Sequence, residues 1–307
     1  MSSSGQTPQL DPGMARRGLL LFVASSTLFG FMAFSAKLAT ARLGGAQVAM
    51  LRFAIAIVPF LCIPRARRAA FTVQRIDLLI YRGVFGGFAV LLYFLAIAHI
   101  PVGEATLLNY TAPVFSGIFA ALFIGEPIRP RVVLPLMVTF SGLVVVVSGQ
   151  GHGIFLGFGP WEALGLCSAV LSGAAVTAIR IARRTETSWS IYASFTLCGL
   201  AATAPFAIST WKSPTPSEWL ALAGVGVFSI GAQLIMTYAF RWVETLIAGV
   251  ISQLAVVVSM SLGAVFLGDP VTLSIVIGTT LTIGGVVTVM IVSSRPGTSA
   301  FDEAAEQ

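Results

Sequence analysis

The chain of 307 residues is 56% hydrophobic and 10% charged, and its mean hydropathy is +0.92. Soluble domains average about 25% charged residues, so this chain lacks the charges to cover a water-facing surface, and we predict a membrane protein. The net charge of +6 does not indicate nucleic-acid binding, because the basic residues lie in short loops between apolar runs. The cysteines fall within apolar runs, at spacings that fit neither a zinc site nor a disulfide framework, so we expect no metal and no cofactor.

The first residues are rich in Ser, Gln, Pro and Gly, and we predict that residues 1–15 form a disordered tail. Arg16 and Arg17 then precede an apolar run of about 20 residues, longer than the core of a secretory signal, which predicts an uncleaved first helix. Nine more runs of spanning length follow. The sequence therefore predicts an all-α integral membrane protein of ten transmembrane helices and a tail at 294–307, the spans lying near 18–38, 46–63, 78–98, 103–124, 131–149, 161–182, 190–211, 218–240, 245–267 and 272–293.

Lys and Arg are distributed unequally between the loops. With the N-terminus inside, thirteen lie on the cytoplasmic side and three on the outer side: Lys37, Arg42 and Lys212. Because cytoplasmic loops carry the excess of basic residues, we expect both termini in the cytoplasm, with the chain in a bacterial inner membrane. Arg52 and Arg82 remain inside the spans, and we expect Arg82 to pair with Asp77 or to face the membrane interface.

The stretch PVGEATLLNYTAPVFSGIFAALFIGEP, residues 101–127, has a second copy 143 positions later, ETLIAGVISQLAVVVSMSLGAVFLGDP, residues 244–270. Pairs at the same offset, such as Gly30/Gly173 and Gly142/Gly285, extend the repeat to most of the chain. The two units, 16–149 and 150–293, hold five predicted spans each. Because five is odd, the second unit must enter the membrane the opposite way up, which predicts an inverted-topology repeat around a central cavity.

The runs AIAHIPVGEATLLNYTAPVFSGIFAALFIGEPI and FSGLVVVVSG, with LFGFMAFSAKLA and MLRFAIA near the start, resemble the EamA-type transporters of the drug/metabolite transporter superfamily. Phe29 stands where that family usually has Trp, and the second half matches more weakly, with Asp269 for the usual Glu. The resemblance covers about residues 18–293. It implies ten helices arranged as a basket, with spans 1, 3, 4, 6, 8 and 9 around a central cavity, and it is strongest to bacterial amino-acid exporters.

Polar side chains within a bilayer are unfavourable and often mark a substrate path. One face of the fourth span carries such groups at helical spacing: Thr106, Asn109, Tyr110, Pro113 and Ser116. Pro113 removes a backbone hydrogen bond and frees the carbonyl of Asn109, which beside an amide and a phenol favours an ammonium or hydroxyl ligand. Gln253 matches Tyr110 in the repeat, and we expect it to face this surface. The alternative is that these groups bond neighbouring helices to one another.

Further candidates for the wall of a substrate cavity are Phe29, Phe34, Tyr93, Thr177, Gln233, Tyr238 and Ser252. Each has a structural alternative, since Phe packs in cores or against lipid, Tyr near a span end joins the interfacial belt, and Ser and Thr bond their own helix backbone. Glycines that would permit gating helices to slide or bend are Gly30, Gly86, Gly87, Gly173 and Gly231. Lys37 and Arg180 lie at matching helix ends, where we expect them to snorkel to the headgroups.

The charges restrict the mechanism. No Asp, Glu or His lies in the middle of a predicted span, so a proton relay through such a residue has no obvious carrier. No Lys or Arg is evident deep in the bundle, which argues against a sugar phosphate as substrate. The sequence holds no G-x-x-x-x-G-K-[ST] segment, so ATP hydrolysis by this chain is not expected.

We therefore predict a secondary exporter of small metabolites, neutral or aromatic amino acids foremost, acting by alternating access as a monomer or homodimer. Another neutral metabolite or a drug, such as a nucleobase or a cationic drug, is an alternative substrate. A lipid scramblase is an alternative from another class. An intramembrane enzyme is disfavoured, because neither H-E-x-x-H nor G-x-S-x-G is present and we expect no catalytic residue.

Overall fold

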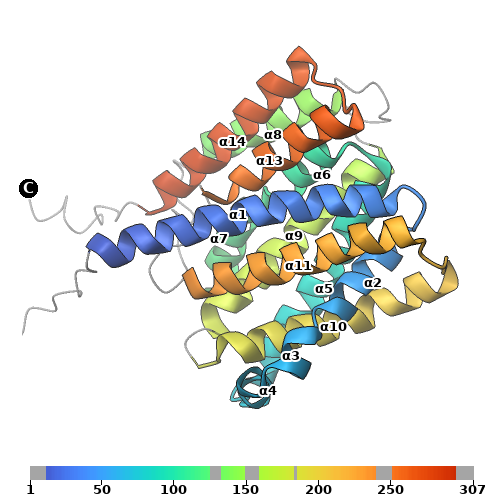
Figure 1. Cartoon of the computed structure of the whole chain (residues 1–307). Coiled ribbons are helices and arrows are strands. Elements are labelled where there is room, and N and C mark those ends of the chain that lie inside the picture. The colour runs from blue at the N-terminus through green and yellow to red at the C-terminus, as the bar shows by residue number, and fades with distance from the viewer. Residues whose placement is uncertain (1–11, 125–132, 149–158, 183–184, 240–250, 295–307) are drawn as a thin grey trace, which may run out of the picture.

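The computed structural model describes residues 12–124, 133–148, 159–182, 185–239 and 251–294, which form helices joined by short loops and contain no strand. Figure 1 shows most of the longer helices running in roughly the same direction, as expected of a membrane bundle. The end of the repeat stretch at Glu126–Pro127, which we interpret as a helix stop, and the predicted start of the ninth span at 245 lie outside the described residues. The first helix begins at Pro12, so residues 12–15 are helical.

The first part of the chain forms five helices: α1 (Pro12–Thr40), α2 (Gly45–Ile55), α3 (Val58–Cys62), α4 (Pro64–Ala70) and α5 (Ile76–His99). The second predicted span, 46–63, is interrupted between α2 and α3. Pro59 lies in the first turn of α3, where its missing N–H is tolerated but cannot continue the preceding helix. Pro64 opens α4 in the same way.

The fourth predicted span is broken into α6 (Val102–Asn109) and α7 (Ala112–Ile124), and α8 (Val133–Ser148) follows. The break lies at Tyr110 and Thr111, directly before Pro113. Because proline has no N–H to donate to the carbonyl four residues earlier, the first helix stops and a new one begins. The prediction of one continuous helix over 103–124 was therefore wrong.

The second half repeats this order with α9 (Pro160–Ala182), α10 (Ser188–Ser209), α11 (Pro216–Ala239), α13 (Leu254–Leu262), the π-helix η2 (Gly263–Leu267) and α14 (Leu273–Ser294). Pro160 and Pro216 occupy the first helical position, where proline is favoured. Thr187 caps α10 by accepting a hydrogen bond from Ser190 N at 3.0 Å. Gly268 ends η2 with φ 69°, a left-handed conformation that glycine adopts without a Cβ clash.

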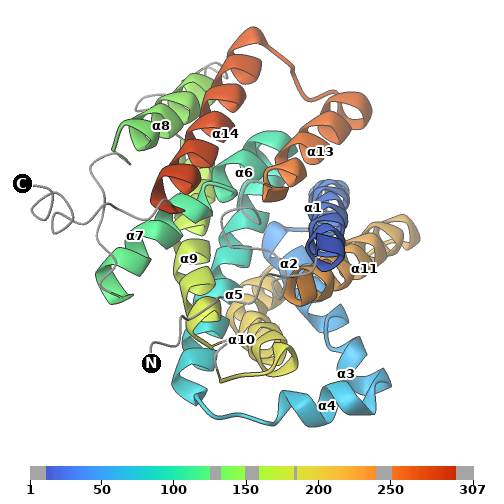
Figure 2. The same ribbon diagram turned by 90° about the vertical axis from the view of Figure 1, so that its left-hand side faces the viewer.

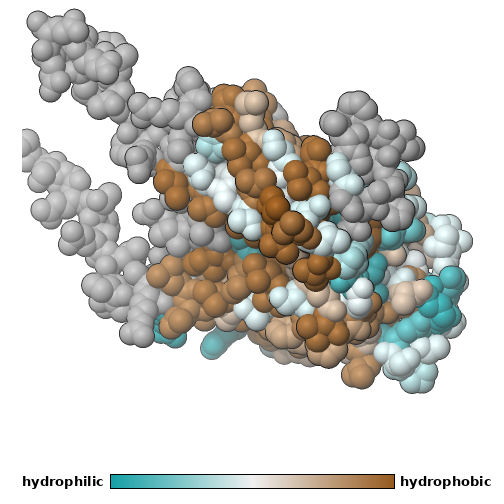
Figure 3. All heavy atoms as spheres, turned by 90° about the horizontal axis from the view of Figure 1, so that it is seen from above, coloured by the Kyte–Doolittle hydropathy of each residue, from teal (hydrophilic) through white to brown (hydrophobic). Residues whose placement is uncertain are grey.

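Six helical segments are long and apolar enough to cross a membrane: Arg17–Thr40, Gly45–Cys62, Ile76–His99, Pro160–Ile179, Ser188–Ser209 and Pro216–Ala239. Large apolar side chains cover the outside of the bundle, with Leu61, Leu220 and Leu273 each at least 70% exposed. Hydrophobic residues dominate the face in Figure 3, and hydrophilic ones gather towards one end. Water would disfavour such a surface, whereas lipid favours it, so the fold is that of a multi-pass membrane protein.

Helix packing follows the sequence repeat. The offset of 143 makes α9 the equivalent of α1, and α11 the equivalent of α5. The contact between α1 and α11 thus has its counterpart between α9 and α5, and the contact between α1 and α13 has its counterpart between α9 and α7. In Figure 2, α1 and α11 lie side by side on one flank, and α8 and α14 lie together at another edge.

The crossing of α8 and α14 shows the same relation at the level of residues. A Cβ added at Gly142 would lie 2.6 Å from Thr282 N, and one added at Gly285 would lie 2.7 Å from Thr139 N. Thr282 and Gly285 are the equivalents of Thr139 and Gly142 at the offset of 143. Reciprocal contacts of this kind are the mark of a two-fold relation. Residue numbers rise along one helix as they fall along the other, so the two helices run antiparallel.

Candidate functional site

Two helix breaks meet inside the bundle. Tyr110 caps the end of α6, and Gln253, its equivalent in the repeat, caps the start of α13. The side-chain amide of Gln253 donates a hydrogen bond of 3.1 Å to the carbonyl of Tyr110, and Gln253 is only 4% exposed. The expected approach of Gln253 to the Asn109–Tyr110 surface is thus seen in the structure.

The role predicted for Pro113 changes with the break. Pro113 was expected inside a continuous helix, freeing the carbonyl of Asn109, but it is the second residue of α7. The carbonyl that bonds a side chain at this break is that of Tyr110, which accepts from Gln253. Discontinuous helices of this kind commonly present backbone groups to a substrate or ion in transporters.

Asn109 and Tyr93 make contacts between helices. The amide of Asn109 donates to Ser168 Oγ of α9 at 2.8 Å. The Tyr93 hydroxyl lies 2.9 Å from Thr106 Oγ1, and Tyr93 is 5% exposed. Tyr93 is therefore buried, and its assignment to an interfacial belt, the alternative considered from the sequence, is wrong.

Gln233 and Thr177 differ in the use of their polar atoms. Thr177 Oγ1 donates to Gly173 O of its own helix at 3.0 Å and reaches Ser116 O at 3.4 Å, as in the structural alternative. Gln233 on α11 is 7% exposed, and across the described ranges no hydrogen bond reaches its side-chain amide. Its polar atoms are not among the fully buried, unpartnered atoms of the described residues, so this amide keeps some accessible surface and is available to a ligand.

The remaining candidates lie apart from these groups. Phe29 is half-buried against the main apolar core. The Phe34 ring lies 5.7 Å from that of Phe266, which is 68% exposed. Tyr238 is 44% exposed on the outside of α11, and Ser252 is half-buried beside Gln253. The structure thus brings Tyr93, Tyr110 and Gln253 into one buried region but leaves Phe34 and Tyr238 towards the surface.

The predicted gating glycines lie where helices approach closely. An added Cβ would lie within about 3 Å of the facing helix at most of them, and contacts of this closeness leave no room for a side chain. The facing atoms are Val258 Cβ at 2.6 Å for Gly30, Gly199 Cα at 2.7 Å for Gly87, Phe115 Cβ at 2.7 Å for Gly173 and, at an ordinary distance, Leu28 Cδ1 at 3.4 Å for Gly231. Gly86 faces the Arg82 guanidinium of its own helix.

Two arginines that the sequence analysis did not place in the site are buried in the bundle. Arg52 on α2 and Arg82 on α5 are each 5% exposed. The expectation that Arg82 pairs with Asp77 is wrong, because Asp77 pairs with Arg75 at 2.6 Å. The inference that no basic residue lies deep in the bundle is wrong as well. A lone arginine in an apolar run was the available signal, but it reads equally as a snorkelling side chain.

Aromatic rings hold both guanidinium groups. The Arg82 Cζ lies 4.2 Å from the centroid of the Phe195 ring, and the Arg52 Cζ lies 5.5 Å from the same centroid and 5.0 Å from that of Phe53. Within the described part of the chain, neither guanidinium has a hydrogen bond or an ion pair, and both Nε atoms are buried and unpartnered. These are cation–π contacts, which leave the planar N–H donors unused.

Glu104 is a further buried ionisable residue without a partner among the described residues. It lies in the first turn of α6, is 3% exposed, and has no partner for either carboxylate oxygen among the described residues. Its electrostatic neighbours are Glu162 and Asp269. Asp269 in turn accepts a hydrogen bond of 3.1 Å from Val102 N, so it caps α6 and closes a small pocket beside Glu104.

Lys37 is half-buried, and its charged end is bound to the backbone of a neighbouring helix. Its Nζ donates to Ile97 O and to Ile100 O, each at 2.8 Å. These carbonyls belong to the last turn of α5, where a cation is also favoured by the helix dipole. The expectation that Lys37 snorkels to the headgroups is therefore wrong. The Arg180 side chain lies outside the described residues.

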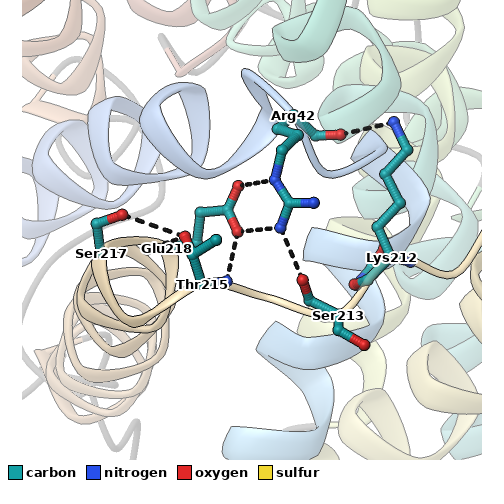
Figure 4. Close-up of polar contacts among 7 residues, drawn as sticks. Arg42, Lys212, Ser213, Thr215, Ser217 and Glu218 are labelled. Carbon is teal, nitrogen blue, oxygen red and sulfur yellow. Dashed lines mark hydrogen bonds and ion pairs between the residues drawn. The ribbon is translucent and has the colours of Figure 1, made fainter.

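The two halves of the chain are tied at one end of the bundle by a polar cluster (Figure 4). Arg42 donates to both carboxylate oxygens of Glu218, at 2.7 and 2.5 Å, and to Ser213 O at 2.7 Å. Gln47 exchanges two hydrogen bonds with the Lys212 backbone, at 2.6 and 3.1 Å. These contacts join the α1–α2 turn to the α10–α11 loop.

A second tie lies at the other end of α10. Glu186 Oε1 accepts from Gln74 N at 2.8 Å and from Arg75 N at 2.5 Å. Thr187 Oγ1 donates to Ala69 O at 3.1 Å. Loops of the two sequence repeats are therefore held together at both ends of the bundle.

Comparison with known proteins identifies relatives of the whole chain. Residues 16–148 and residues 159–291 each match the EamA-like transporter family. The pseudopaline exporter CntI of Pseudomonas aeruginosa is 30% identical over 254 residues, covering 82% of this chain and 88% of that protein. The aromatic amino acid exporter YddG of Ancylobacter novellus is 31% identical over 148 residues, 45% of this chain and 49% of that protein. A solved crystal structure at 24% identity shares the fold, with a TM-score of 0.62 over 91% of this chain and 98% of that one.

Proposed function

The chain belongs to the EamA-like transporter family, and from that premise we propose that it is a secondary exporter of small metabolites, neutral or aromatic amino acids foremost. It works by alternating access and without ATP. The observation that carries the proposal is the meeting of two helix breaks, at Tyr110 and Gln253, in the buried part of the bundle. Transporters place substrate sites where discontinuous helices of two repeats meet.

The architecture we propose is ten membrane spans in two inverted units, 16–149 and 150–293, around this meeting point. The reciprocal, antiparallel contacts of α8 and α14 support it, because a two-fold axis that relates antiparallel membrane helices lies in the membrane plane. Exchange of the shapes of the two units then converts an outward-open state into an inward-open one. Both termini lie in the cytoplasm of a bacterial cell, and the unit is a monomer or homodimer.

The substrate contacts we propose come from aromatic and amide side chains around the breaks. Tyr93, Tyr110 and Gln253 line the region, and the free amide of Gln233 supplies a directed contact. An apolar wall with few polar groups suits a small molecule of modest polarity. Asn109, Pro113 and Thr177 position the helices of this site, and the small residues Gly30, Gly87 and Gly173 permit them to slide.

Transport by the purified protein in proteoliposomes tests the proposal. We expect radiolabelled L-phenylalanine or another neutral amino acid to equilibrate faster than in empty liposomes. The relative named for pseudopaline export makes it necessary to include metabolites beyond amino acids in the panel. Gln233→Ala and Tyr110→Ala should slow transport without reducing membrane insertion, whereas Gln74→Ala, an exposed amide, should not. The proposal of an exporter would be contradicted if no panel compound crossed faster than in empty liposomes. It would also be contradicted if the protein accelerated phospholipid flip-flop and not metabolite flux.

A further inference from the structure

The guanidinium groups of Arg52 and Arg82 form a buried cationic pair that has no counter-charge among the described residues. In the described ranges the ion pairs are Arg42–Glu218 and Arg75–Asp77, and neither involves the pair. A buried cation without a hydrogen-bonded anion is unfavourable. The folded protein nevertheless keeps both guanidinium groups unpaired, which indicates that a bound anion pairs with them.

The two groups converge on one place. Both face the ring of Phe195 on α10, and each is an electrostatic neighbour of the other. Gly86, one turn after Arg82, leaves the space that the Arg82 guanidinium occupies, since a Cβ there would collide with its Nη1. Gly86 and the Phe195 ring thus set the orientation of the Arg82 guanidinium.

The pair also adjoins the proposed substrate site. Tyr93, Tyr110 and Tyr192 are further electrostatic neighbours of Arg52, and among the described residues no carboxylate is one of them. Two of these tyrosines belong to the region where the helix breaks meet. Phe195 is the repeat equivalent of Arg52, so the second repeat offers an apolar ring where the first offers a charge.

We propose that Arg52 and Arg82 bind the carboxylate of the exported metabolite, with the aromatic side chains around them packing on its apolar remainder. Guanidinium groups match the planar carboxylate with paired N–H donors, and these donors have no protein partner here. The substrate class is therefore small organic acids and zwitterionic amino acids, and amines without a carboxylate are excluded. The inference rests on the proposed function, because helix movement must open this buried place to the metabolite.

Binding to the purified, detergent-solubilised protein tests the pair independently of transport. The probes are L-phenylalanine, 3-phenylpropanoate, L-glutamate, inorganic phosphate and 2-phenylethylamine, and the readout is the ligand-induced rise in Tm. We expect at least one carboxylate to stabilise the wild type, and 2-phenylethylamine not to. Arg52→Gln and Arg82→Gln should raise the Kd for that carboxylate by about tenfold or more. Gly86→Ala, which keeps both charges but displaces Arg82, should weaken binding in the same direction, and Arg75→Gln should not.

The unliganded Tm separates a binding role from a structural one. Removing an uncompensated buried charge relieves an unfavourable burial, so both Gln variants should unfold at the wild-type temperature or above it. A lower Tm together with equal loss of carboxylate and amine binding would show that the arginines serve the fold. Three results would overturn the proposal. 2-Phenylethylamine could raise the Tm as much as 3-phenylpropanoate does, phosphate could be the only probe that raises the Tm, or no probe could raise it. Carboxylate binding without flux in proteoliposomes would contradict the proposed export and leave the site intact.

Discussion

Gly284 and Gly285 are neighbours on α14 that face opposite environments, and replacing each by alanine measures the α8–α14 crossing. A Cβ at Gly285 would lie 2.7 Å from Thr139 N and 2.9 Å from Pro135 O, whereas one at Gly284 has nothing within 4 Å. Non-bonded heavy atoms pack at about 3.5–4.0 Å, so the helices must separate by roughly 0.8 Å to admit the methyl group. Besides the Thr139 hydroxyl, which is the nearest atom, the obstructing atoms are backbone, so a rotamer change does not relieve the clash.

The magnitude follows from two opposing effects. Overpacking of this kind destabilises by about 1–3 kcal/mol, and the better helix propensity of alanine returns up to about 1 kcal/mol. Gly285→Ala should therefore lower the free energy of unfolding by up to about 2 kcal/mol, whereas Gly284→Ala should raise it by up to about 1 kcal/mol. Gly142→Ala should lose as much as Gly285→Ala, because the two contacts are reciprocal.

Unfolding by SDS in mixed micelles, followed by circular dichroism, measures these differences. The double variant of Gly142 and Gly285 should lose less than the sum of the single losses, because helices already separated accept the second methyl group readily. The reasoning is refuted if Gly284→Ala and Gly285→Ala have equal effects. Unequal effects of Gly142→Ala and Gly285→Ala would refute the two-fold relation alone.

Three further changes test other contacts. Lys37→Met removes two charge-assisted hydrogen bonds and should lower the free energy of unfolding by about 2–4 kcal/mol, while Lys212→Met, which loses one exposed bond to a carbonyl, should change it little in the same SDS titration. Gln253→Leu leaves the carbonyl at the α6 break unpaired and should lose about 1–3 kcal/mol; an unchanged midpoint would show that water replaces the amide. Glu218→Gln should weaken the contacts in Figure 4, so that the Ser213→Cys variant reacts faster with maleimide. In the parent protein 1 M salt should give the same increase, because salt screens exposed ion pairs. Identical labelling rates would show that this ion pair does not hold the two segments together.

The class of protein and its internal repeat were predictable because they depend on composition and on one spacing. An offset of 143 relates Tyr110 to Gln253 and Gly142 to Gly285 in the sequence. In the structure Gln253 contacts Tyr110, and Gly142 and Gly285 make reciprocal contacts between α8 and α14. Such a repeat can be recognised in a single sequence because the two copies align at one constant offset.

The helix break and the charged pair were not predictable for a different reason. Pro113 in an apolar run is compatible with a kinked helix and with a broken one, and only the packing of α6 and α7 decides. Arg52 and Arg82 meet through Phe195, which lies more than 100 residues away. The sequence does not show which residues a basic side chain inside an apolar run will contact unless that third residue is known. The contacts of Lys37 were misassigned for the same reason.

The hydrogen bond between Gln253 and the Tyr110 carbonyl joins two equivalent positions, and this has an energetic consequence for the proposed cycle. When each repeat adopts the conformation of the other, a contact between non-equivalent positions is replaced by the contact between their repeat equivalents. A contact between two equivalent positions has no such replacement, and it must form again with donor and acceptor interchanged. Here the interchange would require the Tyr110 side chain to donate to the Gln253 carbonyl, and a rigid phenol does not reproduce the reach of an amide. In the proposed cycle the outward- and inward-facing states would therefore not be isoenergetic, and the identities of these two side chains would bias the resting orientation.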